Sequence, residues 1–256
     1  MNGAISRGLV VTAGLILLWQ AFVWITDVPP FLLPSPGRVA AVLWERGDII
    51  AGHAAVTLSQ ILGGLLLGAC AGVLAALLLA AFAPARRWLL PVLLVSQAIP
   101  VFAIAPLLTL WLGFGMASKV AMAAIIIFFP VASAFLDGLR RTDPGWLDLA
   151  RSMGAARGAI LFRLRVPAAL PALASGLRVA TAVAPIGAVV GEWVGASAGL
   201  GFLMLHANAR SQADVMFAAL AVLAAIALAL WFAVDALLRA AIPWSRETFP
   251  DEETTP

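Results

Sequence analysis

Long apolar runs separated by short polar stretches make up most of the chain. Six runs are 18 to 27 residues long, which is the length an α-helix needs to cross the hydrocarbon core of a bilayer. They lack the apolar–polar alternation of membrane β-barrel strands. We therefore predict an all-α polytopic membrane protein, with one transmembrane domain over residues 1–256. The predicted spans are residues 8–25, 56–82, 89–112, 120–139, 168–193 and 214–240.

The first run has a competing interpretation as a secretory signal peptide. Trp19 and Trp24 mark its far end, and no small-x-small cleavage site follows. These features favour a span that is retained.

Small residues in the second predicted span and prolines in the third predict how these helices pack and where they break. Four glycines in residues 56–82 (Gly63, Gly64, Gly68 and Gly72) would let a neighbouring helix approach closely. Prolines at 91, 100 and 106 interrupt residues 89–112. Such breaks are tolerated where the freed backbone groups face protein or a wet cavity.

The stretches between the spans are predicted as loops and short helices. Residues 27–55 read as a proline-rich loop in which GRVAAVLWERG forms a short surface helix. Pro84, Arg86 and Arg87 are expected in a short loop. The polar tail, residues 245–256, has the composition of a disordered segment.

The longest polar interruption, TDPGWLDLARSMGAARGAILFRLRVPAALP, runs from Thr142 to Pro171. Its start resembles a helix start, since Thr142 or Asp143 can cap and Pro144 suits the first position. We predict that Gly154 ends this helix and that a second short amphipathic helix follows and stops at Pro167. Two short helices with apolar faces, held between spans, suit docking into a partner's groove.

Charge gives these spans an orientation. Only 11% of the residues are charged, against about a quarter in a typical soluble domain. With the N-terminus inside, eleven arginines fall on the inner side. Four basic residues fall outside: Arg38, Arg46, Lys119 and Arg210. By the positive-inside rule, both termini and residues 142–167 are expected in the cytoplasm.

No motif for catalysis or metal binding stands out. The one lysine lies in GFGMASKV, which lacks the spacing of a phosphate-binding loop. His53 and His206 have no ligand partner at metal-binding spacing and are interpreted as loop residues near an interface. We therefore predict no catalytic residues, no metal and no cofactor, and a transport subunit rather than an enzyme.

Three polar residues within the spans have two interpretations each. Arg178 and Glu192 can line a translocation path or gate; alternatively, Arg178 snorkels toward the inner side and Glu192 marks the outer interface. Gln97, just before Pro100, is a candidate cavity residue. For Asp137 and Asp235, near inner span ends, pairing with nearby arginines is preferred.

The polar segment resembles the cytoplasmic coupling loop of ABC importer permeases, whose pattern is E-A-A, three residues, Gly, nine residues, I-x-L-P. Asp148-Leu149-Ala150 stands at E-A-A, Gly154 is in place, and Leu164-Arg165-Val166-Pro167 stands at I-x-L-P. Leu149 enlarges a small position of the pattern. LLPSPGRV, QAIPVFAIAPLLTLWLGFG and GEWVGASAGLGFLM look like the nitrate/sulfonate/taurine permease group.

This resemblance implies a six-span type I importer fold in the bacterial inner membrane. It implies two permease subunits, expected as a homodimer, two cytoplasmic ATPase subunits that bind the ATP, and an extracytoplasmic solute-binding protein. Coupling to the ATPase would fall to Asp148, Leu149, Ala150, Gly154, Leu164, Val166 and Pro167. Residues 184–210 look most like permeases for the hydroxymethylpyrimidine precursor of thiamine. The alternatives are sulfonate, taurine or nitrate anions, or a secondary transporter.

Overall fold

The computed structural model describes residues 2–96 and 100–244, and every regular element in these ranges is helical. The elements are α1 (Asn2–Thr26), α2 (Pro36–Glu45), α3 (Gly47–Ala81), α4 (Ala83–Ser96), α5 (Val101–Leu112), α6 (Met116–Arg140), α7 (Pro144–Ser152), α8 (Arg157–Ala159), the π-helical turn η1 (Ile160–Arg165), α9 (Val166–Trp193), α10 (Leu200–Ala209) and α11 (Ala213–Ala241). The tail from residue 245, predicted as disordered, lies outside the described residues.

A helix covers each predicted span range, but several bounds differ. α3 begins at Gly47, nine residues before the predicted start at 56. The third range is divided between α4 and α5, and Pro100 precedes α5. The loop predicted around Pro84 is wrong, because α4 already begins at Ala83. In a first helical turn, the missing N–H of Pro84 costs no hydrogen bond.

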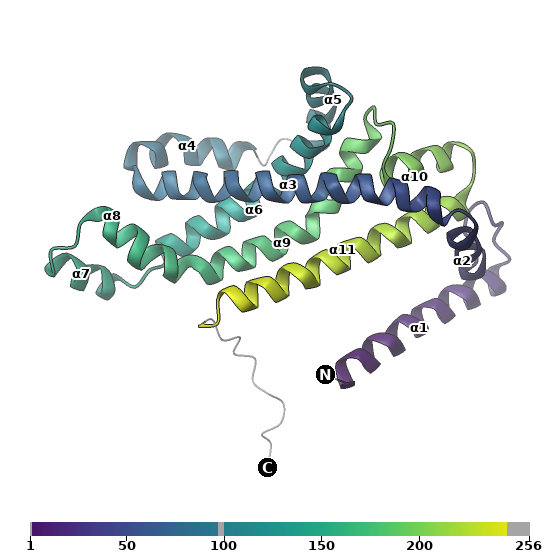
Figure 1. Cartoon of the computed structure of the whole chain (residues 1–256), viewed down its shortest axis with the longest axis horizontal. Coiled ribbons are helices and arrows are strands. Elements are labelled where there is room, and N and C mark those ends of the chain that lie inside the picture. The colour runs from purple at the N-terminus through teal and green to yellow at the C-terminus, as the bar shows by residue number, and fades with distance from the viewer. Residues whose placement is uncertain (1, 97–99, 245–256) are drawn as a thin grey trace, which may run out of the picture.

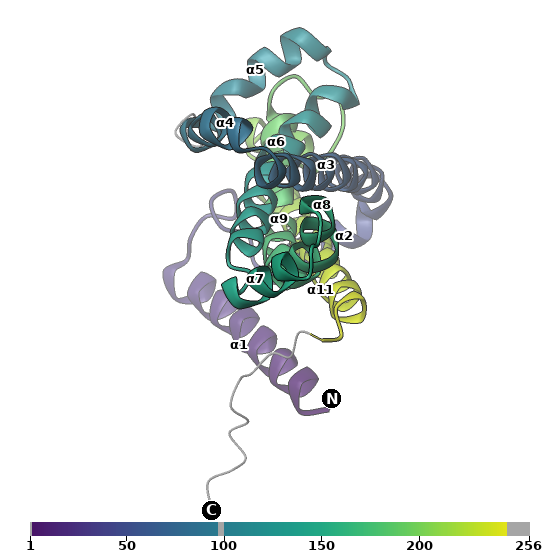
Figure 2. The same cartoon turned by 90° about the vertical axis from the view of Figure 1, so that its left-hand side faces the viewer.

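The long helices α3, α6, α9 and α11 run along the molecule (Figure 1). α7 and α8 lie at one end, and α2 and α10 lie at the other. Figure 2 views the bundle from the end that carries α7 and α8. Segments far apart in sequence therefore form two separate ends, which we call the α7 end and the α10 end.

Small residues hold α6 between α3 and α9. A Cβ added at Gly68 would lie 2.7 Å from the Ala124 carbonyl oxygen and 2.8 Å from Ile127 Cβ. Gly64 and Gly72 are equally close to α6. The predicted close approach of helices through these glycines is confirmed, and it suits a bundle in lipid, where packing drives helix association.

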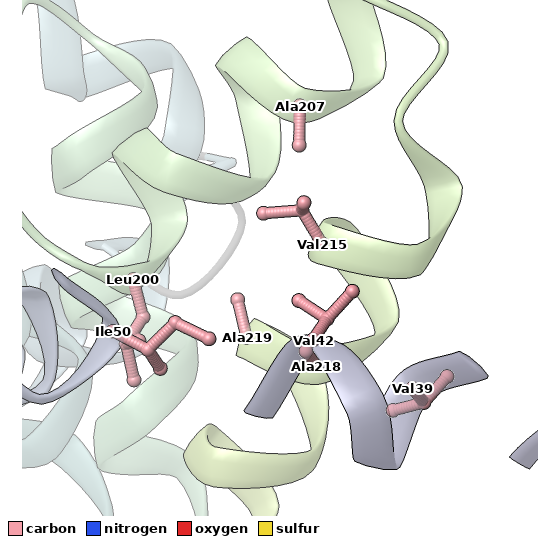
Figure 3. Close-up of a cluster of buried hydrophobic side chains, with 8 residues drawn as sticks. All are labelled: Val39, Val42, Ile50, Leu200, Ala207, Val215, Ala218 and Ala219. Carbon is pink, nitrogen blue, oxygen red and sulfur yellow. The ribbon is translucent and has the colours of Figure 1, made fainter. Parts of the chain in front are cut away.

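A separate apolar cluster fixes the predicted surface helix α2 at the α10 end. It comprises Val39, Val42, Ile50, Leu200, Ala207, Val215, Ala218 and Ala219 (Figure 3). These side chains come from α2, α3, α10 and α11. Burial of this cluster keeps the loops of the α10 end in place.

Within residues 2–96 and 100–244, four helices are long and apolar enough to cross a membrane: Gly47–Ala81, Met116–Arg140, Arg157–Trp193 and Ala213–Ala241. Large apolar side chains on their outer faces are exposed, among them Leu66, Leu74 and Phe232. A soluble monomer rarely exposes apolar surface on this scale. The outer surface is therefore suited to lipid.

Candidate functional site

The polar segment begins as its sequence predicts. The Asp143 side chain caps α7 by accepting a hydrogen bond from the Gly145 N–H at 2.7 Å, and Pro144 follows it. α7 ends at Ser152, and Gly154 then adopts a φ of +76°, a left-handed conformation that favours glycine. The chain reverses at this glycine and returns toward the bundle.

The prediction that Pro167 ends a second short helix is wrong. α8, η1 and α9 form one continuous helix of 37 residues, Arg157–Trp193. The turn before Pro167 is π-helical and therefore wider than an α-helical turn. This wider turn spares the proline ring the clash it would otherwise make with the carbonyl four residues earlier.

An open groove of about 580 Å³ lies between α7 and the first turns of this long helix. Its lining is mostly apolar and comprises Trp146, Leu149, Ala150, Met153, Ala155, Ala159, Ile160, Arg163 and Leu164. Trp146, Leu149 and Met153 are 55%, 61% and 77% exposed. We call this surface the α7 groove. Its open apolar floor is typical of a protein-binding surface.

The residues predicted to couple to an ATPase fall in different parts of this structure. Leu149, Ala150 and Leu164 line the α7 groove. Gly154 forms the turn that brings its two walls together. The walls themselves are α7 and the helix from Arg157.

The remaining predicted coupling residues lie outside the groove lining. Asp148 is exposed and forms an ion pair of 2.8 Å with Arg151, one turn along α7. Val166 and Pro167 begin α9, within the continuous helix. The role of all seven residues in coupling stays a prediction.

At the α10 end, Glu192 lies in a buried polar network. Its side chain is among the most buried of the described residues, with 1% exposure. Thr57 donates a hydrogen bond to Glu192 Oε1 at 2.7 Å, and the Gly201 N–H donates to Oε2 at 2.5 Å. Thr57 Oγ1 also accepts from the Leu200 N–H at 2.7 Å. Side chains of α3 and α9 thus satisfy the N-terminal amides of α10.

His53 extends this network, and sequence reasoning missed its part in it. Both histidines lie in helices, His53 in α3 and His206 in α10, so their interpretation as loop residues is wrong. The Gly199 N–H donates to His53 Nδ1 at 3.0 Å. His53 lies one helical turn before Thr57, and this i, i+4 spacing was the available signal. The network fixes the turn before α10, where Gly199 has a φ of +119°.

Lys119 also differs from its prediction as an outer loop charge. It lies in the first turn of α6 and is 2% exposed. Its ammonium donates to the carbonyl oxygens of Phe114 at 2.9 Å and Gly195 at 3.3 Å. The lysine therefore holds the loop after α9 against the start of α6.

Arg178 forms an ion-paired group with Asp235 and Arg239. Arg178 Nε lies 2.7 Å from Asp235 Oδ1, and Arg239 Nε lies 2.8 Å from Asp235 Oδ2. The pairing preferred for Asp235 is confirmed. Arg178 and Arg239 also line a cavity of about 180 Å³ between α9 and the end of α11.

The two described path residues, Arg178 and Glu192, do not meet in one site. Glu192 belongs to the α10 end, and Arg178 lies on α9 fourteen residues earlier. Gln97 lies outside the described residues. A path or gate role for each of them stays a prediction.

Residues 68–247 match the family model described as "Binding-protein-dependent transport system inner membrane component". The chain belongs to this family. It is a multi-pass membrane protein and a permease subunit of ABC importers, as the resemblance of its polar segment predicts.

Three relatives match nearly their whole length. A probable ABC transporter permease of Haemophilus influenzae is 52% identical over 96% of this chain and 100% of its own. The riboflavin transport system permease of Chloroflexus aurantiacus is 39% identical, covering 93% and 90%. The formylaminopyrimidine transport permease of Halalkalibacterium halodurans is 35% identical, covering 85% and 88%. Permeases named for sulfonates and taurine also match, at 30% and 29% identity.

A solved structure confirms the fold prediction. The chain is similar to an inward-facing MetNI methionine ABC transporter, with a TM-score of 0.62 and 22% identity. The match covers 80% of this chain and 99% of the other. The helices described above therefore form a type I ABC importer permease fold.

Proposed function

We propose that two copies of this permease form the path by which a small polar solute crosses the bacterial inner membrane. In this proposal, a cytoplasmic ATPase docks in the α7 groove and an extracytoplasmic binding protein delivers the solute. ATP binds to the ATPase, and the permease itself has no enzymatic activity. The observation that carries the proposal is the α7 groove, whose apolar side chains are exposed in the single chain.

Charge supports a cytoplasmic position for the α7 end. Arg86 and Arg87 at the start of α4 line a cavity on this side of the bundle, and Arg151, Arg157 and Arg163 lie around α7 and α8. Basic residues near span ends favour the cytoplasm. Both termini are then cytoplasmic, and the α10 end faces the binding protein.

Unburied apolar side chains on α5 support a second permease copy. Phe102, Leu110 and Trp111 are 68%, 77% and 69% exposed, although Ala105 and Leu108 of the same helix pack against Met122 of α6. Figure 1 shows α5 at the outer edge of the bundle. Helix faces of this kind are covered in a membrane by lipid or by another subunit. The path would then lie between the two copies.

We infer a compact nitrogen heterocycle, such as a thiamine pyrimidine precursor, as the solute. The relatives named for formylaminopyrimidine and riboflavin support this class. The alternative is a sulfonate, taurine or nitrate anion. The Arg178 guanidinium gives that alternative little weight, because Asp235 already pairs with it.

Co-purification with the ATPase tests the docking proposal. Leu149→Asp and Met153→Asp place charges on the groove floor and should abolish ATPase retention. Trp44→Ala is the matched control, since Trp44 is 91% exposed but lies on α2 at the other end. Full retention by both groove variants, or equal loss in the control, would refute docking in the groove. Competition between labelled hydroxymethylpyrimidine and taurine in uptake assays tests the solute class.

A further inference from the structure

A second cavity, of about 430 Å³, lies where α7, the start of the long helix and the end of α3 meet. Three arginines line it, Arg151, Arg157 and Arg165, and none of its described lining residues is acidic. Arg151 is paired with Asp148, so the excess positive charge comes from Arg157 and Arg165. The cavity is thus a basic pocket beside, and separate from, the α7 groove.

Arg165 brings an unsatisfied donor to this pocket. Its Nε is buried and has no hydrogen-bond partner among the described residues. A buried donor on a charged group is costly to leave unpaired. Because this Nε is closed to solvent, a ligand in the pocket would contact the other parts of Arg165, which line it.

The backbone offers donors at the same place. The 37-residue helix begins at Arg157, its N-cap residue Ala156 makes no side-chain cap, and Gly158 lines the pocket. The first N–H groups of a helix lack intrahelical partners and carry partial positive charge. Guanidinium groups and a helix N-terminus together are the donor set that binds phosphate oxygens.

The rim of the pocket is apolar on the side of the spans. Ala80 and Ala81, at the end of α3, contribute to it, and so does Phe162, which is 61% exposed. Leu78 and Leu74, exposed on α3, lie one and two turns before this rim. A phosphate carried on acyl chains fits both surfaces, since its head would meet the arginines and its chains would follow α3.

We propose that this pocket binds the phosphate of an anionic phospholipid of the inner leaflet. The lipid as the source of the phosphate rests on the membrane orientation proposed above, whereas the anion site itself does not. Basic pockets on the cytoplasmic side of membrane helices hold lipid head groups by this chemistry.

Native mass spectrometry of the full-length chain, purified with and without its ATPase, tests the proposal. The wild type should retain phosphatidylglycerol in preference to phosphatidylcholine, and the Arg157→Gln/Arg165→Gln variant should lose this retention. One arginine near an anionic lipid changes affinity by about fivefold, so the loss of both should lower it by roughly 25-fold. Arg163→Gln is the matched control, because Arg163 is on the same helix but lines the α7 groove.

Further measurements distinguish a lipid phosphate from a free phosphate as the bound anion. If inorganic phosphate stabilises the wild type and phosphatidylglycerol is not preferred over phosphatidylcholine, the pocket binds a soluble anion and the lipid part of the proposal is wrong. Equal phosphatidylglycerol retention in the wild type and the double variant would overturn the proposal. So would a double variant that loses only its ATPase, because the arginines would then serve the partner protein.

If the double variant does not fold, Arg157→Gln alone carries the test, since Arg157 is exposed. Leu149→Asp should lose the ATPase but keep its phosphatidylglycerol. ATPase docking and lipid binding can therefore be refuted independently of each other.

Discussion

The two ends of the bundle differ in which side chains they bury and which they expose. At the α7 end, apolar side chains are exposed in a groove and the arginines lie at the surface or around an open pocket. At the α10 end, Glu192, Thr57 and Lys119 are buried, and their hydrogen bonds are made within the chain. The α7 end thus leaves an apolar groove open to its surroundings, whereas the polar groups around Glu192 are hydrogen-bonded within the chain. Substitutions should therefore affect stability at the α10 end and binding at the α7 end.

The largest effect is expected for Glu192→Ala. Its loss leaves the Gly201 N–H buried without its acceptor and leaves the Thr57 hydroxyl only the His53 carbonyl at 3.3 Å, at a cost of about 3 kcal/mol in unfolding free energy. Thermal unfolding of the purified permease in detergent measures this. Glu192→Gln keeps one acceptor oxygen and should fall between the wild type and Glu192→Ala. A melting temperature of Glu192→Ala equal to that of the wild type would contradict the contrast between the ends.

A smaller effect is expected for Asp235→Asn. This change leaves two guanidinium groups beside a neutral amide, and we expect a smaller loss of unfolding free energy than for Glu192→Ala. Arg239→Gln, which removes the more exposed partner, should cost less than Arg178→Gln. The reverse order in thermal unfolding would show that the α9–α11 pairing is not the stabilising contact.

At the α7 end, Leu149→Ser should leave stability almost unchanged. The side chain is 61% exposed, so its replacement should alter the unfolding free energy by no more than about 0.5 kcal/mol. ATPase retention should nevertheless fall. A stability loss as large as that of Glu192→Ala would show that the groove belongs to the core of the chain.

The smallest effect is expected for Asp148→Asn. Its ion pair with Arg151 is exposed on both sides and should contribute less than about 0.5 kcal/mol. Raising the salt concentration should reduce even this difference between the variant and the wild type. A salt-independent loss would mean that Asp148 has a second role within the folded chain.

The helical class, the helices over the predicted span ranges and the start and glycine turn of the polar segment could be predicted from the sequence, because each depends on local pattern. Apolar length, glycine spacing and the cap at Asp143 act within a few residues of one another. The network around Glu192 depends instead on contacts between residues 135 positions apart, such as Thr57 and Glu192. Such pairs are brought together only by the packing of α3 against α9 and α10.

Proline was the main source of error in the predicted bounds. Pro84 and Pro167 were both interpreted as breaks, but Pro84 lies in the first turn of α4 and Pro167 lies inside the continuous helix Arg157–Trp193. Proline disrupts a helix interior through its ring and its missing N–H. Neither effect matters in the first turn of α4, and at Pro167 the preceding π-helical turn gives the ring the space it needs.

The continuous helix Arg157–Trp193 connects the two ends of the molecule. At about 1.5 Å per residue, its 37 residues reach roughly 55 Å, from the α7 groove to the Glu192 network. A displacement of its first turn can bend the helix at Pro171 or Pro185, where proline weakens it. If the helix does not bend there, the displacement is transmitted to Trp193. If an ATPase docks in the α7 groove as proposed, this one helix would connect its binding site to the Glu192 network.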